Sequence, residues 1–205
     1  MKTYFKIIKY LQEILLIVSV IILAVLPVLI VFRPDIMTNN VIQILYNISH
    51  LSVFFVMMVR PLADIFTKVR WVRPLVILRK GAGVLSASVI VGLILSKLMV
   101  DSSGYFVSMG TSSYWSFTNY AIFAHLADIS AVILVITSNN LSKRILGSWW
   151  KNIQKLSYVY FYGSVLYVYL SFGGFELLVS LILVTLVTYI AYLKNRNRIL
   201  TLKTI

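Results

Sequence analysis

The stretch QEILLIVSVIILAVLPVLIVF, Gln12 to Phe32, decides the class of fold. Glu13 is its only charged residue, and it lies close to the start of the stretch. A helix needs about 20 mostly apolar residues to cross the hydrocarbon core of a bilayer. The stretch therefore predicts a membrane-spanning helix, and Pro27 inside it predicts a bend.

Five further apolar segments of similar length follow along the chain. They are Val41–Val59, Gly81–Val100, Phe117–Val135, Ile153–Ser171 and Leu177–Tyr192. Of the 205 residues, 60% are hydrophobic and 12% are charged, whereas a soluble domain carries about a quarter charged residues. We therefore predict an all-α integral membrane protein, a six-transmembrane-helix bundle that forms one domain over residues 1–205.

The positive charges are concentrated on one side of this predicted bundle. The chain has nineteen Lys and Arg residues, and only Arg33 and Lys97 fall on the other side. Because basic connections stay in the cytoplasm, we expect both termini to be cytoplasmic in a multi-pass protein of the inner membrane. This distribution favours a lipid bilayer as partner over a nucleic acid. The absence of cysteine excludes disulfides and thiolate metal sites.

Ionisable residues inside membrane spans are rare and are candidates for function. His50 and His125 lie about ten and eight residues into two helices that both run inward, so their depths are similar. Two such imidazoles are able to clamp a haem or to form a polar contact between helices. Asp128 lies on the same helix face as His125, where it would orient the imidazole or simply neutralise it.

The segment LGSWWKNIQKLSYVYFY, Leu146 to Tyr162, resembles a known helix-five signature of the form L-G-x-x-W-K-x-L-H-R-L-x-Y. The matching residues are Leu146, Gly147, Trp150, Lys151, Ile153, Lys155, Leu156 and Tyr158. A second segment, LRKGAGVL, matches an R-R-x-x-G pattern at Arg79, Lys80 and Gly83. In these segments the chain resembles the ferric-reductase-like transmembrane family, most closely the haem-binding membrane subunits of bacterial methionine sulfoxide reductase systems. The resemblance runs from about Ser49 to Leu170.

The resemblance implies a six-helix fold with b-type haem held by histidines on the third and fifth helices. In this sequence the corresponding positions are Leu93, Gln154 and, at or near it, Tyr167, and none of them is histidine. Leucine has no atom that can bind iron. The resemblance therefore implies the family's fold, while the usual bis-histidine site is absent.

Two hypotheses about function remain open at this point. The chain is either a haem-free scaffold or partner subunit of a membrane redox system, or an electron-transfer subunit that holds one b-type haem through His50 and His125. We predict no catalytic residue and no metal site besides that haem, and we expect any catalytic domain to belong to a redox or surface partner protein. A flavin or quinone held between helices leaves little trace in sequence. A transporter lacks support because there is no internal repeat and there are no paired broken helices.

Overall fold

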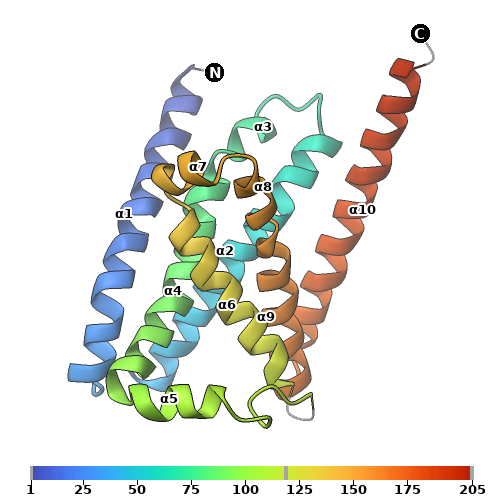
Figure 1. The fold of residues 1–205 in the computed structure, drawn as a ribbon. Helices are drawn as coiled ribbons and strands as arrows, with labels where there is room; N and C mark the ends of the chain where they lie inside the picture. Colours follow the sequence, from blue (N-terminus) through green and yellow to red (C-terminus); the bar gives the residue numbers. More distant parts are fainter. Residues whose placement is uncertain (1, 118–119, 204–205) are drawn as a thin grey trace.

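The computed structural model describes residues 2–117 and 120–203, and it describes side chains for residues 3–117 and 120–196 (Figure 1). The described residues form helices and connecting turns, with no strand among them. This confirms the all-α prediction.

Six long helices dominate the described chain. They are α1 (Lys2–Phe32), α2 (Asn39–Ile65), α4 (Leu78–Val100), α6 (Ala121–Thr137), α9 (Leu156–Phe172) and α10 (Phe175–Lys203). Four shorter helices connect them: α3 (Val72–Leu75), α5 (Ser102–Met109), α7 (Asn140–Leu146) and α8 (Trp149–Ile153). Each of the six predicted segments overlaps one long helix, although α1 and α10 extend well beyond the predicted limits into basic sequence.

Several of these helices fit a lipid bilayer by length and composition. Four described stretches qualify as membrane spans: Thr3–Phe32, Asn39–Ile65, Val72–Val100 and Phe175–Arg196. Helices α6 and α7 qualify together as a fifth, bent by 96° at a short break. Helix α9 has 17 residues, fewer than the roughly 20 that a straight span needs. The structure therefore supports a multi-pass membrane protein with four or five candidate spans.

Large apolar side chains point outward from the bundle, as lipid contact requires. On α1 and α10, Ile21 and Leu186 are 53% and 54% exposed. In water such surfaces would be costly, whereas lipid tails are as apolar as these side chains. The exposed faces therefore fit the predicted bilayer environment.

Helix α4 lies at the centre of the packing and contacts α1, α2 and α6, while α9 contacts α6, α2 and α10. Glycines allow the closest approaches. A Cβ atom on Gly81 would lie 2.9 Å from the Leu15 Cβ of α1, and one on Gly163 would lie 2.8 Å from the Phe123 carbonyl oxygen of α6. Small residues at such crossings let helices pack closely in a membrane.

The two ends of the bundle differ in Figure 1. The described start of α1 and the described end of α10 lie at one end, together with α3, α7 and α8; we call this the termini end. Helix α5 lies across the opposite end, the α5 end. Asp101 caps α5, because its carboxylate accepts a hydrogen bond from the Gly104 backbone N–H at 2.8 Å.

Candidate functional site

His50, one of the two candidate haem ligands, contacts α9 and α10. Its ring is half-buried and stacks on Phe161, with ring centroids 6.1 Å apart and an interplanar angle of 18°. The Ser180 hydroxyl of α10 lies 3.5 Å from His50 Nε2. These contacts make His50 part of a helix–helix interface.

His125, the other candidate, lies beneath the connection between α5 and α6. Its ring stacks on Tyr114 at 3.5 Å between centroids and 8° between planes, and Trp115 meets it edge-on at 5.7 Å. Partial burial raises the pKa of the Tyr114 phenol above its ordinary value, and a hydrogen bond with Tyr105 raises it further. The His125 Nδ1 atom is buried and has no hydrogen-bond partner within the described part of the chain.

The two histidines have separate surroundings. Helices α2 and α6, which carry them, each pack against both α4 and α9. His50 contacts Phe161 and Ser180, whereas His125 contacts Tyr114 and Trp115. Asp128 is half-buried on the same helix as His125, but within the described part of the chain no hydrogen bond or ion pair joins their side chains. Joint ligation of one iron by His50 and His125 stays a prediction.

The three positions that correspond to haem ligands in the resembled family make contacts with different parts of the bundle. Leu93 is buried in a cluster with Val89 and with Leu26 of α1. Gln154 donates a hydrogen bond from Nε2 to the Thr137 hydroxyl at 3.4 Å. Tyr167 is half-buried and packs edge-on against Phe172 at 6.2 Å. Leu93 thus contacts α1, Gln154 contacts α6, and the ring contact of Tyr167 lies within α9.

A group of three hydroxyls, which sequence reasoning missed, joins α2, α4 and α9 in the interior. Ser49 Oγ lies 3.0 Å from Ser86 Oγ and 3.0 Å from Tyr160 Oη, and Ser86 Oγ lies 2.8 Å from Tyr160 Oη. Ser86 also donates to the Ser49 carbonyl at 2.8 Å. We call this the hydroxyl triangle. All three side chains are buried, so each polar group is satisfied without water.

Apolar side chains fill the space beside the hydroxyl triangle. Phe161 is fully buried and belongs to a cluster that includes Val53, Ala87, Ala131 and Val165. These residues come from α2, α4, α6 and α9. The middle of the bundle is therefore filled by the chain's own side chains.

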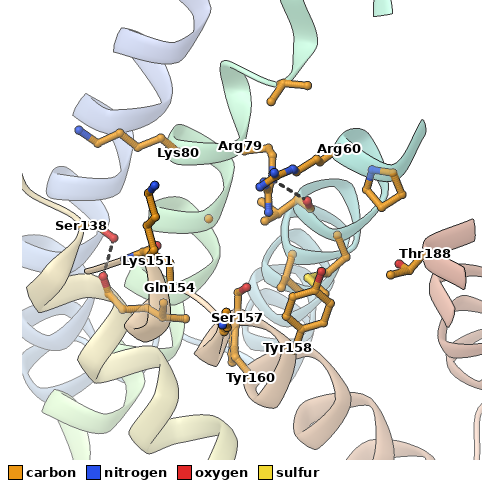
Figure 2. Close-up of a pocket in the computed structure, with 18 of the residues that line it drawn as sticks. Arg60, Arg79, Lys80, Ser138, Lys151, Gln154, Ser157, Tyr158, Tyr160 and Thr188 are labelled. Atoms are coloured by element: carbon orange, nitrogen blue, oxygen red, sulfur yellow. Dashed lines mark hydrogen bonds between the residues drawn. The ribbon is translucent and has the colours of Figure 1, made fainter. Parts of the chain in front are cut away.

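A cavity of about 970 Å³ lies near the termini end of the bundle, and Figure 2 shows side chains that line it. Its walls come from α2, the α3–α4 region, α6, the α8–α9 region and α10. Five cations line it, namely Arg60, Arg79, Lys80, Lys151 and Lys155, together with one carboxylate, Asp64. We call it the cationic cavity. The sequence signal that locates it is the pair of basic segments that carry the family resemblance, LRKGAGVL and WWKNIQK.

Arg79 is held at the wall of the cationic cavity by α2. Its Nε donates a hydrogen bond to the Val56 carbonyl oxygen at 3.0 Å, and Figure 2 shows Arg60 beside it. On the opposite wall Trp150 donates from Nε1 to the Thr137 carbonyl oxygen at 2.9 Å, which fixes α8 against α6. The resembled helix-five segment thus builds one wall of the cationic cavity.

No three His, Asp or Glu side chains in the described ranges come together as a metal site. No protein-family model, no curated protein and no solved structure matches the chain. The resemblance to the ferric-reductase-like family therefore rests on its motifs alone.

Proposed function

We propose that this chain is a haem-free six-helix membrane scaffold that acts as a partner subunit in a membrane redox system. The hydroxyl triangle carries the proposal. It links α2, α4 and α9 through contacts of 2.8–3.0 Å between buried oxygens. In the resembled family, haem lies between the third and fifth helices, which correspond to α4 and α9 here.

The fully buried Phe161 ring supports the same proposal, because a haem between α4 and α9 would have to displace it. Leu93, the ligand-equivalent position on α4, packs toward Leu26 of α1. A site with a filled interior and an apolar ligand position does not fit a bound b-type haem. We therefore propose that the fold of the family is kept for structural purposes.

The proposal includes six crossings with both termini in the cytoplasm. Helix α9 is short, but α8 precedes it at once, and the Gln154 backbone N–H donates to the Trp150 carbonyl at 3.0 Å across the junction. Helices α8 and α9 together cover residues 149–172, about 36 Å at 1.5 Å per residue if they were straight. Helix α6 would be accommodated by local thinning of the bilayer.

Charge supports this orientation. Both described chain ends lie at the termini end in Figure 1, which fits an even number of crossings. The basic connections that contain Lys68, Arg70, Lys143 and Arg144 belong to the same end. Basic connections mark the cytoplasmic side of an inner-membrane protein. We propose that a redox or surface partner supplies the catalytic domain.

A difference absorption spectrum tests the haem-free proposal. The full chain is expressed with haem supplied, purified in mild detergent, and recorded as dithionite-reduced minus oxidised. We expect folded, monodisperse protein with no sharp b-type α-band. A family member with intact histidine ligands, prepared in parallel, provides the positive control.

The variants His50→Ala and His125→Ala decide what a positive spectrum would mean. A stoichiometric α-band that either substitution removes would overturn the proposal and establish an electron-transfer subunit with relocated ligands. A band that survives both substitutions would equally overturn it, and would direct attention to Tyr167 and Gln154 as ligands.

A further inference from the structure

The cationic cavity adjoins the core cluster on which the proposed function depends, because Val53 and Tyr160 belong to both. It has a volume of about 970 Å³, at the upper end of the range of small-molecule sites, about 300–1,000 Å³. A cavity of this size has room for a small-molecule ligand. Three features of the cavity walls indicate the chemistry of that ligand.

The first feature is positive charge without carboxylate partners. In the described part of the chain, the only ion pair joins Arg33 to Asp35, outside the cavity wall. The cavity's own carboxylate, Asp64, accepts instead from the Asn195 amide at 3.4 Å. None of the five cations of the wall forms an ion pair within the described residues, although Lys80 and Lys155 donate to the side chains of Asn140 and Asn152 at 3.5 and 3.0 Å. Their positive charge is therefore left for an anion to neutralise. Paired guanidinium groups, such as those of Arg60 and Arg79, suit phosphate because they donate in a planar fork.

The second feature is the apolar part of the wall. Val53 and Met57 of α2, Val84 of α4 and Leu134 of α6 all line the cavity. Val53, Met57 and Leu134 belong to the buried core. A small inorganic anion would leave these surfaces without a partner. An occupant that carries hydrocarbon next to its anionic group would cover both kinds of wall.

The third feature is a buried hydroxyl on α10. Thr137 and Thr185 donate to carbonyls one turn back along their own helices, at 2.7 and 2.8 Å. Thr188 also lines the cavity, but its Oγ1 is buried and has no partner among the described residues. Figure 2 shows its side chain at the cavity. A buried hydroxyl is rarely left unsatisfied, so an acceptor or donor in the cavity would complete it.

We propose that the cationic cavity binds the phosphate head and the adjoining chain segment of an anionic membrane lipid. The phosphate lies between Arg60, Arg79 and Lys151, and the glycerol and first methylenes lie against the apolar wall. Basic pockets between helices at the cytoplasmic side are suited to anionic lipid heads. A lipid is favoured over a soluble phosphate compound because the cavity joins the bundle interior and is walled by core residues. This proposal does not depend on whether haem is bound.

Titration of the delipidated full chain in detergent tests the proposal. The probes are short-chain phosphatidylglycerol, short-chain phosphatidylcholine and inorganic phosphate. Isothermal titration calorimetry measures the affinity of each. We expect phosphatidylglycerol to bind about tenfold or more tighter than phosphatidylcholine, and inorganic phosphate not to compete at equal concentration. Equal competition by inorganic phosphate would overturn the lipid assignment in favour of a soluble phosphate ligand. The absence of saturable binding would overturn the site itself.

Paired variants separate this cavity from general attraction to a basic surface. The double variant Arg60→Gln/Lys151→Gln removes two exposed cations of the cavity wall. The control, Lys68→Gln/Arg70→Gln, removes two exposed cations that do not line it. We expect the first to weaken phosphatidylglycerol binding at least about tenfold and the second to leave it unchanged. Equal weakening by both would overturn the proposal.

Thr188→Val provides a variant that does not put folding at risk. It keeps the shape of the side chain and removes only the unpartnered hydroxyl. We expect binding of phosphatidylglycerol to weaken severalfold, while the melting temperature of the lipid-free protein stays the same or rises. A fall in melting temperature with unchanged binding would show that Thr188 serves the fold and does not contact the lipid.

Discussion

The hydroxyl triangle and the cationic cavity are built largely by the same helices. The polar side chains of the triangle bond to one another, whereas the cations of the cavity lack carboxylate partners in the part of the chain that the structure describes. In the triangle, the buried hydroxyls of Ser49, Ser86 and Tyr160 satisfy one another. In the cavity, Arg60 and Lys151 have no carboxylate partner among the described residues. Tyr160 belongs to both regions, because it lines the cavity and its hydroxyl closes the triangle.

This difference indicates that the hydroxyl triangle holds the helices together, whereas the cationic cavity binds a ligand. A polar group buried inside a membrane protein must be satisfied by the protein, whereas an exposed one at the end of the bundle is satisfied by water or by a ligand. The triangle meets this condition internally, so substitutions there should affect folding alone. The exposed cations of the cavity do not need a protein partner, so substitutions there should affect binding and leave folding largely intact.

The largest expected effect comes from removing one aromatic ring beside the hydroxyl triangle, compared with the removal of one at the cavity wall. Phe161 is fully buried beside the triangle, whereas Tyr158 lines the cavity and is 41% exposed. We expect Phe161→Ala to lower the free energy of unfolding by about 3 kcal/mol, the low end for such a truncation because lipid does not drive apolar burial. Tyr158→Ala should cost less than about 1 kcal/mol.

Reversible unfolding of both variants in mixed micelles, followed by circular dichroism, measures these values. Equal losses in the two variants would mean that the cavity wall is as tightly packed as the core. The proposed division between a filled middle and an open end would then be wrong.

The second test compares two glycines and asks how closely the neighbouring helix lies to each. A Cβ on Gly163 would meet the Phe123 carbonyl at 2.8 Å, whereas one on Gly83, at the cavity wall, would meet only Val56 Cγ2 at 3.7 Å. We expect Gly163→Ala to cost about 1–3 kcal/mol, because α6 and α9 must separate. Gly83→Ala, with its ordinary contact, should leave the melting temperature unchanged or raise it slightly. A larger loss for Gly83→Ala than for Gly163→Ala would contradict this packing.

The sequence predicts the helices well because each one is a local, apolar segment. All six predicted segments overlap a long helix, and the excess of cations at one end follows from simple counting. The predicted ends of a helix are less accurate where the helix extends into Lys- and Arg-rich sequence, as α1 and α10 do. The predicted fifth helix starts at Ile153, whereas α9 starts at Leu156 because a turn at Gln154 and Lys155 separates it from α8.

The contacts between helices lie beyond such local reasoning. Rise per residue gives the depth of His50 and His125, but it does not give the direction in which each ring points. In the structure one ring meets Phe161 and the other meets Tyr114. The hydroxyl triangle likewise joins residues 37 and 74 positions apart along the chain. Nothing in the sequence around Ser49 or Ser86 distinguishes them from serines that face lipid.

The smallest expected effect on stability comes from removing one hydroxyl oxygen from the triangle. Tyr160→Phe keeps the buried ring and removes one corner, while Ser49 and Ser86 still lie 3.0 Å apart. We expect a loss of about 0.6–1.7 kcal/mol, the range of hydrogen bonds between membrane helices. Tyr158→Phe, at the cavity wall, should show no loss by the same unfolding measurement. No loss for Tyr160→Phe would mean that the two serines satisfy each other alone, and the link from α9 to α2 and α4 would then rest on Phe161 and its apolar neighbours.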